Sequence, residues 1–318
     1  MKNIAVLEGG YSHEKVISLL SAETVYSNID RERYNPVKVR IDEEGWFAYQ
    51  NDKKIEINRS DFSFSGFKFD FVFIVIHGTP GEDGKLQAYF DMLGLPYSTC
   101  SHLASTLTFN KFVCNQYLKN FSVKVAEAVL IRQHESFDST KIIAKVGLPC
   151  FVKPADGGSS FGVTKVKEES KLDDAIKLAL THGTQAIIES FMVGREVTNG
   201  IYKGKNGIKV LPITEIVSKN DFFDFDAKYK GESDEITPAD LPNELEQRIK
   251  SLTKYIYEVL DLDGICRADY IIQNNEPYLI EINTVPGMSK ESLIPQMAVY
   301  EGINLKDMLT EVIEVNSI

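Results

Sequence analysis

The sequence predicts an α/β protein of more than one domain. Its 318 residues are enough for several units, each with a substantial core. A strand, a helix and further strands follow one another over the first hundred residues, in the order typical of an α/β domain. The run "FDFVFIVIHG" at 69–78 is almost continuously apolar, as expected of a parallel strand buried on both faces.

The N-terminal unit, residues 1–100, begins with a predicted strand at 3–8 and an amphipathic helix at 12–29. Short strands are predicted within 36–60, and the apolar run described above adds a parallel strand. We expect the helix to turn four apolar side chains inward, namely Val16, Leu19, Leu20 and Val25.

Two further units follow. The central unit, residues 101–184, starts with helical sequence up to about residue 120 and continues as two strands joined by a Gly-rich turn. The C-terminal unit covers residues 185–318. Its predicted elements are three strands, an acidic aromatic loop at 219–240, a helix at 242–260, a hairpin at 268–288 and terminal helices from 291 onward.

Composition narrows the class of protein. The net charge of −11 argues against a nucleic-acid binder or a membrane-surface protein, although a local basic cleft for an anion stays possible. The start, MKNIAVLEGG, lacks the long apolar core of a signal peptide, and no stretch is long and apolar enough to span a membrane. We therefore expect a cytoplasmic protein. The four cysteines are far apart in sequence, so we interpret them as reduced core thiols.

The hairpin "ADYIIQNNEPYLIEINTVPGM" carries an unusual set of polar residues. With a turn centred on Asn275, Asp269 lies opposite Glu281, and Arg267 lies opposite Asn283. The other face is then apolar and carries Ala268, Tyr270, Ile272, Tyr278, Ile280 and Ile282. Facing carboxylates roughly 5 Å apart repel, so something positive must lie between them.

Two interpretations of the polar face are open. It could be the solvent-facing side of a sheet, which is the ordinary case. Alternatively, Asp269, Glu281 and Asn283 offer the hard oxygen ligands that suit Mg²⁺, which usually shares phosphate oxygens. The ordered arrangement favours metal binding.

The Gly-rich turn "VKPADGGSSFG" at 152–162 could hold that phosphate. Its glycines let backbone N–H groups approach an anion, Ser159 and Ser160 add hydroxyl donors, and Lys153 adds a positive charge. Such a turn is often only a hairpin, and it matches neither a Walker loop nor a dinucleotide fingerprint.

Three other features are ambiguous alone. Glu14 could bind a ligand or simply favour the start of a helix. His77 ends a buried strand, where α/β folds place ligand sites, yet a lone histidine there is more often structural. The segment "FDFDAKYKGESDE" at 223–235 could be a mobile lid, with Lys228 and Tyr229 at its centre.

Six motifs in this order resemble the ATP-grasp ligases, and within them the D-alanine–D-alanine ligase family. They are "EGGYSHEKVISL" (8–19), "HGTPGEDGKLQ" (77–87), "VKPADGGSSFGV" (152–163), "DAKY" (226–229), "RAD" (267–269) and "EINTVPGMSKESL" (281–293). The resemblance covers nearly the whole chain. It implies an ATP-grasp fold behind an N-terminal parallel-sheet domain, and a ligase that makes D-alanyl-D-alanine for peptidoglycan through an acyl phosphate.

The resemblance also implies roles for individual residues. Asp269, Glu281 and Asn283 match the positions that hold two Mg²⁺ or Mn²⁺ ions on ATP. Arg267 and the backbone N–H of Gly287 match the groups that stabilise the tetrahedral oxyanion. The remaining implied residues are Lys111, Lys153, Ser160, Glu189, Glu196 and Lys228 for ATP, Glu14, Ser159 and Tyr229 for the first D-alanine and loop closure, His77 near that substrate, and Ser292 and Leu293 for the second.

Some points stay open at this stage. Tyr229 favours an amine nucleophile, so the alternatives are a D-alanine–D-lactate or D-alanine–D-serine ligase, and a non-enzymatic nucleotide-binding protein on the same scaffold. Phe223, Gly157 and Phe161 depart from the residues common in relatives, in the segments that the resemblance expects to close over the substrates. The resemblance implies a homodimer built through the N-terminal domain.

Overall fold

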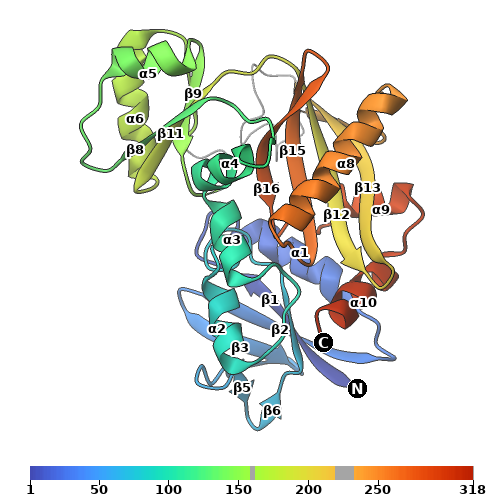
Figure 1. Ribbon diagram of the computed structural model, residues 1–318. Coiled ribbons are helices and arrows are strands. Elements are labelled where there is room, and N and C mark those ends of the chain that lie inside the picture. The colour runs from blue at the N-terminus through green and yellow to red at the C-terminus, as the bar shows by residue number, and fades with distance from the viewer. Residues whose placement is uncertain (158–161, 219–232, 318) are drawn as a thin grey trace.

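The computed structural model of the protein describes residues 1–157, 162–218 and 233–317. These residues form three α/β units, each built on its own main sheet, as Figure 1 shows from blue through green to red. The predicted fold class is therefore confirmed.

The N-terminal sheet has the strand order β4-β3-β2-β1-β7, with β1 parallel to both β2 and β7. The apolar run at 69–78 supplies β7 and is buried, as predicted. The elements of this unit are β1 (Lys2–Gly9), α1 (Lys15–Asn28), β2 (Tyr34–Asp42), β3 (Gly45–Gln50), β4 (Lys53–Glu56), β5 (Ser63–Phe64), β6 (Phe67–Lys68), β7 (Phe71–Ile74) and α2 (Lys85–Leu93).

The predicted inward face of α1 is partly wrong. Val25 is buried, but Val16 and Leu20 are 65% and 53% exposed. Ser18 and Ser21 take inward positions instead. The Ser18 hydroxyl accepts from the Gly9 N–H at 3.0 Å and donates to the Val75 carbonyl at 2.8 Å, so it satisfies backbone groups at the strand ends.

The central unit carries a four-stranded sheet, in the order β10-β9-β11-β8, with α5 and α6 packed on it. The predicted long helix before it is divided at Asn110, whose side chain caps the second helix by accepting from the Val113 N–H. The elements are α3 (His102–Phe109), α4 (Lys111–Lys119), β8 (Ala128–Arg132), α5 (Ser139–Val146), β9 (Cys150–Pro154), β10 (Thr164–Val166), the short 3₁₀ helix η1 (Glu169–Lys171), α6 (Leu172–Thr181) and β11 (Gln185–Ser190).

The C-terminal unit carries a five-stranded antiparallel sheet in the order β14-β13-β12-β15-β16. Its elements are β12 (Arg195–Gly204), β13 (Gly207–Ser218), β14 (Ser233–Ile236), α8 (Asn243–Val259), β15 (Ile265–Gln273), β16 (Glu276–Asn283), α9 (Leu293–Tyr300) and α10 (Leu305–Val315). Because β11 pairs with β8 and β9, we propose that the boundary between the two last units lies after Ser190 rather than at 184/185.

The hairpin of β15 and β16 confirms the predicted pairing of Asp269 with Glu281 and of Arg267 with Asn283. The register shifts once, between Asp269 and Tyr270, which leaves Ile280 as the extra residue of a bulge. The bulge changes the alternation along β16. The predicted apolar face is therefore wrong at Tyr278 and Ile280, and Leu279 packs in the core instead.

One hydrophobic cluster joins the N-terminal and C-terminal units. It combines side chains of β1, α1 and β7 with side chains of β12, β13, α9 and α10. The central unit has a separate cluster between its sheet and the helices α5 and α6. The first and last thirds of the chain thus share a core. The sheet of the central unit has its own core, whereas the helices α3 and α4 pack against the sheet and α8 of the C-terminal unit.

The four cysteines are all buried and free, as predicted. Among the described residues, no helix is both long and apolar enough to cross a membrane.

Candidate active site

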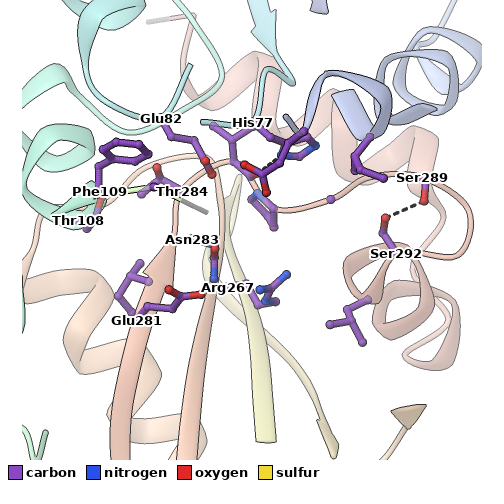
Figure 2. Close-up of a pocket in the computed structure, with 18 of the residues that line it drawn as sticks. His77, Glu82, Thr108, Phe109, Arg267, Glu281, Asn283, Thr284, Ser289 and Ser292 are labelled. Atoms are coloured by element: carbon purple, nitrogen blue, oxygen red, sulfur yellow. Dashed lines mark hydrogen bonds between the residues drawn. The ribbon is translucent and has the colours of Figure 1, made fainter. Parts of the chain in front are cut away.

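A cavity of about 320 Å³ opens where the three units meet. Figure 2 shows Arg267, Glu281 and Asn283 side by side at the end of the hairpin, with His77 and Glu82 on the opposite wall. The predicted site residues that line it are Glu14, His77, Lys111, Arg267, Glu281, Asn283, Gly287, Ser292 and Leu293. The structure therefore brings these residues, distant in sequence, to one cavity.

Asp269 lies just behind this lining and is nearly buried. Arg267 donates to both carboxylate oxygens, from Nε to Oδ1 and from Nη2 to Oδ2, each at 2.8 Å. The Thr198 hydroxyl donates to Oδ1 at 2.6 Å, and Asn283 Nδ2 donates to Oδ2 at 3.0 Å. Four donors therefore fix this carboxylate in one orientation.

Glu281 is paired with a different cation. Lys111 Nζ lies 3.1 Å from Glu281 Oε2 and also donates to the Gly157 carbonyl at 2.6 Å. Burial works against the ammonium, yet the Glu281 carboxylate raises the pKa of Lys111 above its ordinary value. Each of the two facing carboxylates of the hairpin is thus neutralised by its own cation, Asp269 by Arg267 and Glu281 by Lys111.

The donor set fits a hard divalent cation. Asp269, Glu281 and Asn283 offer two carboxylates and one amide oxygen from neighbouring strands, the ligand types that Mg²⁺ and Mn²⁺ prefer. No group of three or more His, Cys, Asp or Glu side chains with metal-site geometry occurs in the described part of the chain. An ion held here would complete its shell with water and phosphate oxygens.

Lys111 is the predicted nucleotide residue that lines the cavity, whereas Lys153, Glu189 and Glu196 are not among its lining residues. Lys153 on β9 and Glu189 on β11 pair at 2.6 Å, and both side chains are largely buried. Glu196 on β12 is half-buried and, two residues from Thr198, lies on the same face of the sheet. These side chains extend the polar surface from the hairpin toward the central unit.

On the N-terminal side, His77 is buried, and its ring is held at both nitrogens. Nδ1 lies 2.8 Å from the Val285 carbonyl, and Nε2 lies 3.2 Å from Ser21 Oγ. Burial lowers the pKa of His77, so the ring is neutral. The sequence left a structural role open, and these contacts show that His77 links the end of β7 to the loop after β16.

Glu14 approaches the backbone at Gly78. This glycine has φ +68°, and a Cβ there would come within 2.9 Å of Ser12 and 3.4 Å of Glu14 Oε2. A side chain at this position would therefore be strained and would crowd the Glu14 carboxylate. The start of α1 and the end of β7 are thus held close together at the cavity wall.

Glu82 is a cavity residue that the sequence-based reasoning missed. Its carboxylate accepts from the Gly78 N–H at 2.7 Å, on the strand-end loop that Glu14 also approaches. Burial, and after it the Glu14 carboxylate, raise the pKa of Glu82 to about 8. The available signal was its place in "TPGEDG", directly after a buried strand, but the spacing gave no indication of a second acid facing Glu14.

The loop after β16 completes the far wall. A Cβ on Gly287 would come within 2.8 Å of Ser292 Oγ, so a side chain there would require Ser292 to move. Ser289 and Ser292 share a hydrogen bond of 2.8 Å between their hydroxyls, drawn as a dashed line in Figure 2. Ser292 precedes α9, so Leu293 opens that helix with backbone N–H groups available for an anion.

Some predicted residues lie outside the described part of the chain. They are Ser159, Ser160, Lys228 and Tyr229, together with the departures at Phe161 and Phe223.

Comparisons with known proteins agree with this geometry. The family model described as "D-ala D-ala ligase C-terminus" matches residues 117–314, and "D-ala D-ala ligase N-terminus" matches 3–65 and 48–100. Proteins named D-alanine–D-alanine ligase from Bacteroides fragilis and Azobacteroides pseudotrichonymphae are 48% and 51% identical. The alignments cover 98% of each chain in the first comparison and 99% of each in the second.

Solved structures show the same relationship. The VanG D-Ala:D-Ser ligase from Enterococcus faecalis superposes with a TM-score of 0.90 at 32% identity, covering 99% of both chains. The D-alanine–D-alanine ligase from Bacillus anthracis complexed with ATP has a TM-score of 0.81 at 26% identity, covering 100% of this chain and 97% of the other. The chain therefore belongs to the D-alanine–D-alanine ligase family.

Proposed function

We propose that this chain joins two D-alanine molecules to D-alanyl-D-alanine at the expense of ATP, for peptidoglycan synthesis. The observation that supports it most is the meeting of four kinds of group in one cavity. These are a hard-oxygen ligand set, a guanidinium, a glycine N–H and an acid from the N-terminal unit, represented by Glu281, Arg267, Gly287 and Glu14.

In the first step, the carboxylate of one D-alanine attacks the γ-phosphorus of ATP, and the bond to ADP breaks. Asp269, Glu281 and Asn283 would hold two Mg²⁺ or Mn²⁺ ions, which neutralise charge on the phosphate oxygens. Lys111 and Lys153 contact phosphates, while Glu189 and Glu196 accept from the adenine amino group and the ribose. Of these acids, Glu189 now pairs with Lys153.

In the second step, the neutral amine of the other D-alanine attacks the carbonyl carbon of the acyl phosphate. The C–O bond to phosphate then breaks, inorganic phosphate leaves, and the nitrogen loses one proton as the amide forms. Arg267 and the Gly287 N–H stabilise the oxyanion that forms. Ser292 and the N-terminus of α9 at Leu293 bind the second carboxylate, because helix N-termini favour anions. Glu14 binds the ammonium group of the first substrate, with His77 nearby.

Four residues outside the described ranges belong to the same proposal. From the resemblance, we assign Ser159 and Ser160 to covering the phosphates, and Lys228 and Tyr229 to closing over the substrates. A lid is useful to this chemistry because water would hydrolyse an exposed acyl phosphate. Tyr229 favours an amine nucleophile over the hydroxyl of D-lactate.

The test is a coupled assay of ADP release with product identification. We expect release to need both Mg²⁺ and D-alanine, with the dipeptide as product. The 32% identity to a D-Ala:D-Ser ligase makes D-serine the alternative nucleophile to include, followed by D-lactate. Release only with D-lactate or D-serine would replace the proposal with that ligase. Tight ATP binding without turnover on any D-amino acid would favour a non-enzymatic role.

The homodimer stays part of the proposal. The exposed apolar side chains of α1, Val16 and Leu20, lie on the N-terminal unit, which is where the resemblance places the interface. Sedimentation analysis of the wild-type protein checks this, and a monomer at micromolar concentration would contradict it.

A further inference from the structure

The loop that carries Gly287 is fastened to the N-terminal unit at two points. Before the glycine, the Val285 carbonyl lies 2.8 Å from His77 Nδ1. After it, the Met288 N–H donates to Ser21 Oγ at 3.1 Å. Ser21 and His77 are themselves joined, with 3.2 Å between Oγ and Nε2. We call Ser21 and His77 the loop clamp.

The direction of every hydrogen bond in the loop clamp follows from its neighbours. A carbonyl only accepts, so His77 carries its proton on Nδ1 and donates it to Val285. The neutral ring then accepts at Nε2 from the Ser21 hydroxyl, whose oxygen accepts from Met288. Each polar atom of the clamp thus has a partner of the opposite kind, and one proton arrangement satisfies all of them.

Burial makes this arrangement rigid. Ser21 is 0% exposed and His77 is 5% exposed, so water does not compete for these hydrogen bonds. Between the two fastened residues, Pro286 has a fixed φ and lacks an N–H. Few backbone dihedral angles are therefore free between Val285 and Met288, and the clamp restricts where the Gly287 N–H can point.

We propose that Ser21 and His77 are positioning residues, which hold the loop of Val285–Met288 so that the Gly287 N–H faces the oxyanion of the second step. This inference rests on the proposed function, because it assigns a purpose to the Gly287 N–H. Neither clamp residue needs to touch the reacting atoms. Their contribution is to the accuracy of the donor's position, and errors of about 1 Å can cost roughly a hundredfold in rate.

The decisive comparison is Ser21→Ala against Ser18→Ala. Both serines lie on α1, both are fully buried, and each makes two hydrogen bonds. Ser18, however, bonds only within the N-terminal unit, to Gly9 and Val75. We expect both variants to lose stability to a similar extent, and only Ser21→Ala to lower kcat, by about ten- to a hundredfold, with the KM for ATP unchanged.

Two substitutions at His77 separate its two contacts. His77→Asn keeps a donor near the Nδ1 position for Val285, and His77→Gln keeps an acceptor near the Nε2 position for Ser21. We expect each variant to lower kcat less than the Ser21→Ala, His77→Asn double variant. Equal kcat in Ser21→Ala and Ser18→Ala would overturn the proposal.

A measurement independent of turnover tests the clamp itself. In ¹⁵N spectra of the wild-type imidazole, we expect a protonated Nδ1 and an accepting Nε2 for His77. We also expect faster hydrogen exchange at the Met288 amide in Ser21→Ala but not in Ser18→Ala. The opposite tautomer, or unchanged exchange, would contradict the clamp. Because these readouts need no substrate, they distinguish its failure from failure of the proposed ligase activity.

Discussion

Asp269 shows how a single side chain can be held from several directions. Three of its four hydrogen bonds come from Arg267 and Asn283, to which we assign other work in the reaction. The fourth comes from Thr198, a buried residue on the central strand β12. Arg267 and Asn283 would therefore exchange their hydrogen bonds with Asp269 for other contacts during the reaction, whereas Thr198 can keep its own. Thr198 thus orients the Asp269 carboxylate for binding an ion.

Thr198→Val should weaken divalent-ion binding by roughly ten- to a hundredfold, as expected when the partner of a metal ligand is lost. The measurement is Mn²⁺ binding to the ADP complex by electron paramagnetic resonance. Thr214→Val is the matched control, because Thr214 is equally buried on the adjacent strand but shares its hydrogen bond with Thr237. Equal Mn²⁺ affinity in the two variants would refute the role of Thr198.

Glu281→Gln should lower kcat by at least about a hundredfold, since it removes a charge that faces the transferring phosphoryl group. Circular dichroism should show an unchanged fold, because the amide can still accept from Lys111. The control is Glu276→Gln on the same strand, where the carboxylate pairs with Lys124 and Arg248 at the other end of the hairpin. Near-normal turnover in Glu281→Gln would mean that the metal assignment is wrong.

Glu82→Gln should change the pH dependence of stability. The pKa of Glu82 is raised to about 8, so the folded protein holds this proton more tightly than the unfolded chain. Its contribution is complete below about pH 4.5 and is lost as the pH rises through about 8. The slope between these values is at most about 1.4 kcal/mol per pH unit. In urea unfolding of the ligand-free protein, the free energy of unfolding should fall less between these pH values in the variant than in the wild type. Parallel pH profiles of the two proteins would contradict this.

At the scale of elements, α1 shows the limit of reasoning from apolar periodicity. Its inward positions include Ser18 and Ser21, because the strand ends below it present backbone groups that need partners. Hydrophobic spacing could not reveal this, since the partners come from β7 and from the loop after β16. Two apolar side chains were assigned to the wrong face as a result.

Val16→Ala and Val25→Ala test the face that α1 buries. Both remove the same two methyl groups, but Val16 is 65% exposed and Val25 is 0% exposed. Measured on the monomer, at a protein concentration too low for dimer formation, we expect the first to change the free energy of unfolding by less than about 0.5 kcal/mol and the second to cost roughly 1–3 kcal/mol. Equal costs in chemical denaturation would contradict the observed orientation of the helix.

The hairpin was predicted more successfully, partly because two local features compensate. The turn has two residues, Asn274 and Asn275, both with positive φ, rather than a centre on Asn275. The bulge at Ile280 then adds one residue to β16 and restores the pairing of Asp269 with Glu281. The site pairing was therefore predictable from sequence, whereas the alternation of the residues before it was not.

At the scale of the whole molecule, the order of motifs predicted which segments meet at the site. It did not predict how deeply the site residues are buried or which segments share a hydrophobic core. Arg267 and Glu14 could be assigned to one site from their motifs, and Lys111 from the resemblance to the family. Glu82 could not, because its raised pKa depends on burial and on charged groups of all three units, among them Glu14, Lys111 and Glu281. The shared core of the N-terminal and C-terminal units likewise depends on packing between distant segments, which no local pattern encodes.

The shared core predicts how far the effect of a large-to-small substitution spreads through the molecule. Met308→Ala in α10 should cost about 2–5 kcal/mol and speed hydrogen exchange in β1 as well as β12, because all three contribute to one cluster. Ile188→Ala in β11 should instead speed exchange in β9 of the central unit. Unchanged exchange in β1 of Met308→Ala would show that the two units unfold separately.

Lys111 holds Glu281, and Lys153 holds Glu189, across the side of the cleft assigned to ATP. If the phosphates of ATP bind both ammonium groups, the two carboxylates lose their ion pairs. Glu281 can then bind a divalent ion, and Glu189 can accept from the amino group of the base. Binding of ATP would therefore replace each of the two ion pairs by contacts with the nucleotide or its cation. Without a divalent ion, the Glu281 carboxylate would repel the phosphates of the bound nucleotide. We therefore expect ATP and its divalent ion to bind together, as one complex.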